Sequence, residues 1–379
     1  MAGPLEGLKI VEFVGLGPTS FTAMMLSDMG ADVVRIDRRS KAGEPNPYPV
    51  LGTKYDVMAR NRGTVFLDLK TPEGLQVAFE LLEKADALLE GFRPGVMERV
   101  GLSPDKCIEL NPRLVYTRIT GWGQSGPLSH TAGHDINYIA LSGLLAATGA
   151  PGTPPLPPLN LIGDFGGGGM LAAFGVLCGI MYAQRTGKGQ VVDAAMLDGT
   201  NLMGAMIFGL RSMGRWSLER GRNWIDGGAP YYGCYECADG KYVGIGPIEP
   251  HFFALLAEKA GLDEDIFRDI GVERWPALRE EMARVFRTRT RAEWCGLLER
   301  SDACVSPVLD LDEAPAHPQN AARGNFVDVD GVLHSAPAPR FSRTPGAIRA
   351  KDTGDAASTL ETWGLPHERI AALREKGVI

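Results

Sequence analysis

The stretch Leu8-Lys-Ile-Val-Glu-Phe-Val14-Gly15-Leu-Gly17-Pro18 decides the fold of this chain. Its first seven residues are rich in β-branched side chains and predict a short strand, and the glycines and proline that follow predict a tight turn. Next come a predicted helix from Thr19 to Met29, ended by Gly30, and a strand from Asp32 to Asp37. Together these elements predict a βαβ unit with two parallel strands.

The same alternation of strand and helix continues beyond this unit. We predict strands at 64–67, 87–89, 114–119 and 190–194, and an amphipathic helix at 71–84 with Pro72 near its first turn. Strands that alternate with helices favour an α/β fold with a doubly wound, Rossmann-like parallel sheet. Ligands of such sheets bind at the carboxyl ends of the strands.

The length of 379 residues exceeds the usual size of a single core and predicts two domains. After Gly227 the pattern changes to a hairpin that turns at Asp239-Gly240 and to helices at 250–260, 275–287 and 291–300. We predict a large α/β domain over 1–200, completed by 335–379, and a smaller α+β domain over 225–330. An extended strand over 336–345 is expected to lead back to the large domain, where a helix over 367–376 ends the chain.

Composition narrows the class of protein. The formal charge of −7 lacks the basic excess that nucleic-acid binding requires. The N-terminus shows no basic region followed by an apolar core, so no secretory signal is predicted. Six scattered cysteines do not form a disulfide framework, and we expect reduced thiols in the cytoplasm.

Two features of the sequence resemble a membrane span and a zinc site. Residues 165–183 form an uncharged run long enough to cross a membrane, but six of them are glycine, which favours a buried, closely packed helix and no membrane contact. Cys234 and Cys237 lack the second pair that a zinc ribbon needs. On a strand, residues three apart point to opposite faces, so we expect structural cysteines rather than metal ligands.

The first turn also resembles a nicotinamide-binding fingerprint. Gly15-Leu-Gly17-Pro-Thr-Ser20 begins like Gly-x-Gly-x-x-Gly, but Ser20 replaces the third glycine. Asp37 closes the second strand, where an acidic residue meets a ribose, yet Arg35 and Arg38 beside it suit phosphate oxygens better. A phosphorylated nucleotide such as coenzyme A accounts for both the fold and these charges.

Two motifs carry candidate chemistry, Gly133-His134-Asp135-Ile-Asn137-Tyr138 and Gly163-Asp164-Phe165-Gly166. Each offers one titratable group at the predicted start of a helix, within backbone that lets another molecule approach. An isolated histidine is commonly a core residue and an isolated aspartate a helix cap. As a pair, His134 and Asp164 would serve as acid and base on opposite faces of one carbon.

The chain resembles coenzyme A transferase family III over nearly its whole length. The resemblance rests on Pro4–Glu12, Gly30–Asp37, Asn61–Gly63, Leu67–Lys70, Gly91–Gly95, Gly121–Pro127 and Gly189–Asp193. Within that family, Gly133–Tyr138, Gly163–Gly166 and Gly246–Pro250 are similar to the α-methylacyl-CoA racemase branch. The resemblance implies an interlocked homodimer and an acyl-CoA thioester substrate.

It also implies residue roles. His134 and Asp164 would remove and return the proton at the α-carbon, and the backbone N–H of Asp135 would receive the enolate oxygen. Glu249, from the second domain, would orient His134, although it is equally a surface carboxylate at a helix start. In a coenzyme A transferase, the alternative, Asp164 would instead be a nucleophile that forms a mixed anhydride.

The same resemblance implies the coenzyme A contacts. They are Arg38, Leu67, Asp68, Leu69, Lys70, Gly91, Phe92, Arg93 and Arg99, with Gly133, Ile136, Asn137 and Tyr138 nearer the reacting carbon. Solvated charges and turn geometry are the alternative explanation for several of them. No metal or separate cofactor is required, because coenzyme A is part of the substrate.

Overall fold

The computed structural model describes residues 3–38, 48–263, 265–349 and 355–379. The chain divides into two compact units. Unit 1 comprises Met1–Ser142, Leu159–Met203 and Asn325–Ile379, and unit 2 comprises Gly143–Pro158 and Gly204–Gly324. The sequence predicts residues 143–158 in the large domain, whereas the structure groups them with unit 2. The predicted functional division into a coenzyme A-binding domain and a smaller domain stays a prediction.

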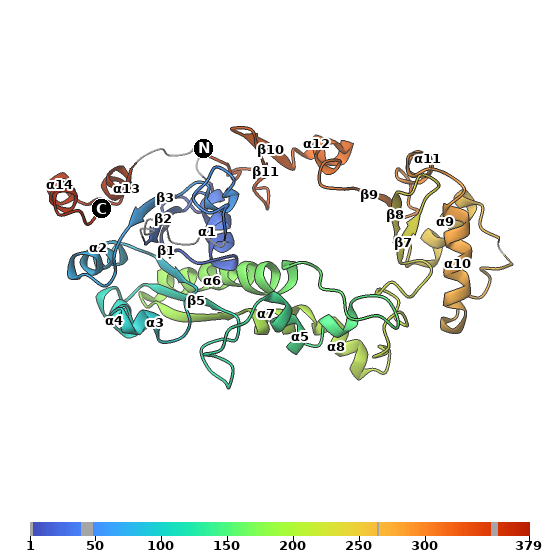
Figure 1. Cartoon of the computed structure of the whole chain (residues 1–379), viewed down its shortest axis with the longest axis horizontal. Helices are drawn as coiled ribbons and strands as arrows, with labels where there is room; N and C mark the ends of the chain where they lie inside the picture. The colour runs from blue at the N-terminus through green and yellow to red at the C-terminus, as the bar shows by residue number, and fades with distance from the viewer. Residues whose placement is uncertain (1–2, 39–47, 264, 350–354) are drawn as a thin grey trace. The chain divides into compact units, whose positions relative to one another are not determined.

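Unit 1 is built on a six-stranded parallel sheet in the order β3-β2-β1-β4-β5-β6 (Figure 1). Its strands are β1 (Lys9–Phe13), β2 (Asp32–Asp37), β3 (Gly63–Phe66), β4 (Ala87–Glu90), β5 (Val115–Thr120) and β6 (Gln190–Ala195). The predicted doubly wound parallel sheet is therefore confirmed. β1 pairs with both β2 and β4, so the strand order reverses between β1 and β4, the place where open α/β sheets bind ligands.

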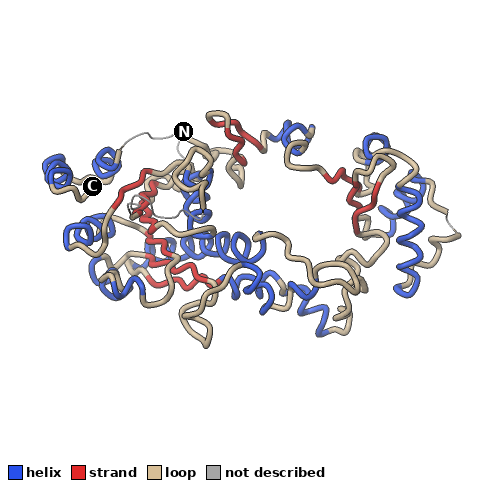
Figure 2. The backbone as a smooth tube through the Cα atoms, viewed as in Figure 1, coloured by secondary structure: helices blue, strands red, loops and turns tan. Residues whose placement is uncertain are grey.

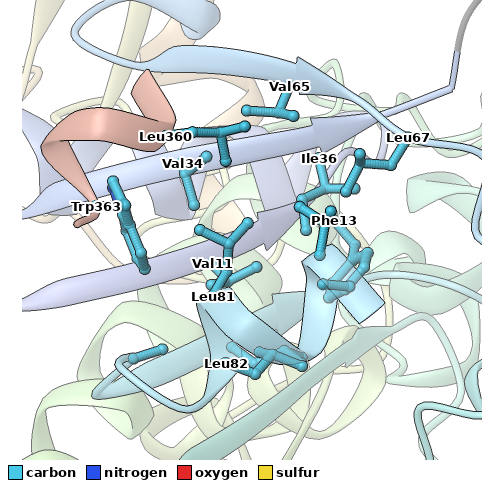
Figure 3. Close-up of a cluster of buried hydrophobic side chains, with 14 of the residues drawn as sticks. Val11, Phe13, Val34, Ile36, Val65, Leu67, Leu81, Leu82, Leu360 and Trp363 are labelled. Atoms are coloured by element: carbon cyan, nitrogen blue, oxygen red, sulfur yellow. The ribbon is translucent and has the colours of Figure 1, made fainter. Parts of the chain in front are cut away.

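Helices cover both faces of this sheet (Figure 2). Alternate residues of β1 serve the two faces: Ile10 packs with α1 (Pro18–Asp28) and α6 (Leu171–Thr186), and Val11 packs with α2 (Pro72–Leu82). The Val11 face also packs against α13 (Ala356–Thr362) and α14 (His367–Glu375). Leu360 of α13 and Trp363, the residue directly after α13, are fully buried there (Figure 3). The C-terminal segment thus completes the core of unit 1.

Several shorter elements of unit 1 were not predicted. They are η1 (Val57–Ala59), α3 (Val96–Arg99), α4 (Pro104–Leu110), α7 (Met196–Met203) and the antiparallel hairpin β10 (Phe326–Val329) with β11 (Val332–Ser335). The predicted extended strand over 336–345 is wrong, because the structure assigns no strand there. Pro337, Pro339 and Pro345 have no N–H to donate to a ladder, which explains the difference.

The uncharged run consists of two joined helices, the π-helix η3 (Leu161–Met170) and α6. Small residues let α6 lie close to the sheet: a Cβ at Gly179 would lie 2.6 Å from Val115 Cγ1. The expected burial holds for one face only, because Phe174 and Met181 on the other are 65% and 60% exposed. By length and composition alone, Leu161–Thr186 is also a candidate membrane span, but its α6 half packs on β5 and β6 like a core helix.

Unit 2 contains an antiparallel sheet of β7 (Gly233–Glu236), β8 (Tyr242–Ile245) and β9 (Val305–Val308). Its helices are α8 (Ala205–Ser212), α9 (Pro250–Ala260), α10 (Trp275–Phe286), α11 (Arg291–Leu298) and α12 (Pro318–Arg323), with short 3₁₀ turns η2 (Leu145–Ala147), η4 (Val272–Arg274) and η5 (Ala314–Ala316). The predicted hairpin is confirmed. Cys234 is exposed and Cys237 buried, which confirms that they lie on opposite faces.

Candidate active site

His134 lies at the N-terminal end of α5 (Asp135–Leu141), as the sequence predicts. Its side chain is exposed, and its backbone N–H donates to Asn137 Oδ1 at 2.9 Å. Gly133 is required by packing, because a Cβ there would lie 2.8 Å from the Tyr138 ring and 2.9 Å from Trp122. Asn137 and Tyr138, predicted as substrate contacts, therefore also shape the backbone that presents the imidazole.

Asp164 lies in the first turn of η3 and is half-buried. Its Oδ2 accepts a hydrogen bond from Asn160 Nδ2 at 3.2 Å. Burial raises the pKa of the Asp164 carboxyl, and the nearby charge of Asp135 raises it further, against the opposing effects of Asn160 and His134. Asp164 thus holds a proton more readily than a carboxyl in water.

The carboxylate of Asp135 connects the two segments. Its Oδ2 accepts the backbone N–H groups of Gly163 at 2.6 Å and Asp164 at 2.8 Å. The sequence predicts only a backbone role for Asp135, and these side-chain hydrogen bonds were not predicted. An aspartate directly after the candidate histidine was the available signal, but sequence cannot show which amides its carboxylate meets.

The turns that follow β1 and β4 lie beside these groups. A Cβ at Gly17 would lie 3.6 Å from Asp164 Oδ2, and Gly17 has a φ of +61° that favours glycine. A Cβ at Gly91 would lie 2.5 Å from Thr19 Oγ1, so the turn after β4 packs on the start of α1. Asp164 therefore lies next to the crevice where the strand order reverses.

A pocket of about 1160 Å³ lies at the carboxyl ends of β1, β2 and β3. Of the predicted coenzyme A contacts, it is lined by Arg38, Leu67, Asp68, Leu69, Lys70 and Phe92. Its volume suits a ligand of nucleotide size or larger. Thr71, Glu73, Val96, Val100 and the C-terminal Lys376, Gly377 and Val378 also line it and were not predicted. Lys376 adds a cation that no motif could have placed there.

The other predicted contacts do not line this pocket. They are Gly91, Arg93, Arg99, Gly133, Ile136, Asn137 and Tyr138. Arg93 lies close enough to Tyr138 for its charge to lower the pKa of that phenol, which burial chiefly, with Asp164 and Asp135, raises to about 12. The roles of these residues toward a ligand stay predictions.

Glu249 belongs to unit 2, where it is exposed and directly precedes α9. His134 and Asp164 belong to unit 1. The predicted action of Glu249 on His134 therefore stays a prediction. Within the described residues, no group of three or more His, Cys, Asp or Glu side chains is arranged to hold a metal ion.

Comparison with known proteins places the chain in a family. The model of CoA-transferase family III matches residues 5–352. The chain is 40% identical over 381 residues to "Alpha-methylacyl-CoA racemase" of Mus musculus. The matched region covers 99% of this chain and 97% of that protein. The Homo sapiens protein of the same name is 40% identical over 383 residues, with the same coverage.

A solved structure shares the fold. The CAIB/BAIF family protein from Brucella suis superposes with a TM-score of 0.80, covers 99% of this chain and 100% of its own, and is 23% identical in sequence. At that identity the likeness concerns the fold alone. The family match over residues 5–352 and the two relatives at 40% identity carry the assignment. The chain belongs to CoA-transferase family III.

Proposed function

We propose that this chain is an isomerase, an α-methylacyl-CoA racemase that epimerises 2-methylacyl-CoA thioesters. The observation that carries the proposal is the link between the two motifs: the Asp135 carboxylate holds the backbone of Asp164 while Asp135 itself directly follows His134. The 40% identity to two proteins named for this activity supports the same reaction.

The reaction is a proton removal and return. The thioester carbonyl acidifies the α-carbon, so a base takes the α-proton and the C–H electron pair moves onto the carbonyl oxygen as an enolate. A proton delivered to the opposite face then gives the other enantiomer. For one enantiomer neutral His134 is the base and protonated Asp164 the acid, and for the other the roles are exchanged. The raised pKa of Asp164 supports this, since its carboxyl must carry a proton in half of the catalytic states.

The enolate oxygen needs hydrogen-bond donors. The first N–H groups of a helix have no partner inside the helix, and Asp135 is the first residue of α5. We assign its N–H to the enolate oxygen. Loss of one such donor typically costs about 10²–10³ in rate.

The pocket at the carboxyl ends of β1 to β3 holds the coenzyme A moiety in this proposal. Arg38 and Lys70 supply cations for its phosphates, and Leu67, Leu69 and Phe92 supply apolar surface. The proposed reaction uses no metal ion or redox group. Coenzyme A enters and leaves as part of the thioester.

We also propose that the active protein is an interlocked homodimer in the cytoplasm. Phe174, Met181, Leu202 and Met203 of α6 and α7 are each more than half exposed in the single chain, an apolar surface that a second copy would cover. In the dimer, the partner's Glu249 orients His134. All six cysteines are free thiols, consistent with a reducing compartment.

Deuterium exchange tests the function against its alternative. Metal-stripped protein is incubated in D₂O with each enantiomer of a 2-methylacyl-CoA and no acceptor acid, and the α-position is followed by mass spectrometry. A racemase introduces one deuterium at the α-carbon of both enantiomers. Absence of exchange, with coenzyme A transfer only on addition of an acceptor acid, would establish the transferase with Asp164 as nucleophile.

A further inference from the structure

The Asp135 carboxylate is an unusual buried anion. The residue is 4% exposed, its Oδ2 accepts two backbone N–H groups, and its Oδ1 is buried without a hydrogen-bond partner. A buried carboxylate oxygen without a partner loses the stabilisation that water gives it. Such a cost points to a role for the charge itself.

The two hydrogen bonds fix backbone geometry. The N–H groups of Gly163 and Asp164 lie in the first turn of η3, where helical N–H groups have no partner inside the helix. The anionic side chain accepts hydrogen bonds from both N–H groups, and its negative charge interacts favourably with the positive end of the helix dipole. Because Asp135 begins α5, one side chain sets where the segment of Asp164 lies relative to that of His134.

The groups around Asp164 determine how strongly the charge of Asp135 raises the pKa of the Asp164 carboxyl. His134, Asp135 and Tyr138 are the titratable groups that face it from α5 and the residue before it, and Asn160 contacts it from its own side. The residues of α1 and α7 that lie against η3 are not ionisable. They are Pro18 and Phe21 from α1, and Met196, Thr200 and Met203 from α7. Of these neighbours, Asp135 is the carboxylate whose charge opposes ionisation of Asp164.

We propose that the Asp135 side chain is a positioning residue that fixes the Asp164 carboxyl relative to His134 and, by its negative charge, favours the protonated form of Asp164. The inference rests on the proposed racemase function and adds the side chain to the backbone role of the same residue. It explains the glycine at 163 as well. A Cβ there would lie 2.7 Å from Asp135 Oδ2, although the backbone angles of Gly163 are open to other residues.

Two variants separate geometry from charge. Asp135→Asn keeps an oxygen that can accept the N–H groups but removes the charge. It should move the acidic limb of the kcat/KM profile to lower pH, with KM for the acyl-CoA changed by less than about twofold. Gly163→Ala keeps the charge but displaces the carboxylate. It should lower kcat about 10- to 100-fold without moving that limb.

Amide hydrogen exchange gives a readout that does not depend on racemase activity. Peptides covering 161–170 should lose protection in Gly163→Ala and in Asp135→Ala, because the N–H groups of Gly163 and Asp164 lose their acceptor. Asp86→Asn is the matched control: its Oδ2 accepts the Lys9 N–H at 2.9 Å before β4, away from the site, and the variant should match wild type in pH profile and in protection of 161–170.

The outcomes are distinct. If wild type fails to exchange the α-proton, the proposed function is wrong, while the protection of 161–170 still tests the hydrogen bonds. If wild type is a racemase but Asp135→Asn leaves the acidic limb unmoved and Gly163→Ala retains full kcat and protection, the positioning role is wrong.

Discussion

The buried carboxylate of Glu90, at the end of β4, forms an ion pair with Arg118 of β5, with 2.9 Å between Oε1 and Nε. Its Oε2 accepts the N–H of Phe92 at 2.7 Å, and Arg118 reaches Glu98 of α3 at 2.9 Å. Arg118 therefore binds Glu90, directly before the turn between β4 and α3, and Glu98, in the helix that follows the turn. Because that turn carries Phe92 at the edge of the pocket, the ion pairs hold part of the proposed coenzyme A site.

Glu90 predicts a dependence of stability on pH. Burial raises its pKa to about 7, although Phe92 N–H and Arg118 act to lower it. Between the ordinary value of 4.5 and about 7, the folded state therefore binds more protons than the unfolded state, and stability falls as pH rises through this window. Relative to Glu90→Gln, wild type should lose up to about 3 kcal/mol of unfolding free energy across it.

Urea unfolding of wild type and Glu90→Gln at one protein concentration and a series of pH values checks this prediction. Two stability curves that stay parallel across the window would show that Glu90 has an ordinary pKa in the folded protein.

If His134 and Asp164 are the acid and base of the proposed reaction, each should be indispensable on its own. His134→Ala and Asp164→Ala should each lower racemisation by about 10²–10⁴, because either enantiomer needs both an acid and a base. Titration calorimetry should show coenzyme A binding nearly unchanged, since neither side chain lines the pocket. His130→Ala, an exposed histidine four residues before His134, is the control and should retain wild-type rate. Full activity in either catalytic variant would remove that residue from the mechanism.

The cations of the pocket should act on binding rather than on chemistry. Lys70→Ala and Lys376→Ala should each raise KM for acyl-CoA about tenfold with kcat nearly unchanged, because each removes one positive charge from the pocket proposed to hold the phosphates. A pantetheine thioester, which lacks the nucleotide, should not distinguish these variants from wild type. Lys188→Ala, exposed beyond the end of α6, is the control. An unchanged KM in Lys376→Ala would show that the C-terminal residue lines the pocket without contacting the nucleotide.

The sequence predicted the elements whose signals are local. The first βαβ unit was placed within one or two residues because Gly15 to Pro18 and Gly30 separate its helix from the strands on either side. His134 and Asp164 were likewise correctly placed at helix starts. Short elements such as α3, at four residues, carry too little periodicity to detect.

What could not be predicted depends on contacts between distant residues. The carboxylate of Asp135 meets amides 28 and 29 residues away, and Lys376 reaches the pocket from the end of the chain. Likewise, the apolar composition of α6 predicted burial all round, whereas the fold buries the stripe of Ala172 and Val176 and exposes Phe174. Which face of an apolar helix is covered depends on its partners.

Assembly provides the last prediction. If a second copy covers the exposed apolar residues of α6 and α7, light scattering should give twice the 40.8 kDa mass of one chain, and activity should fall on dilution as the dimer dissociates. A site shared between subunits makes a sharper claim. When inactive His134→Ala and Glu249→Ala chains are co-refolded, half of the dimers are mixed, and each mixed dimer has one intact pair of His134 and Glu249. About a quarter of wild-type activity should return. A site built within one chain gives no recovery, because every His134 then lies with a mutated Glu249 or is itself absent.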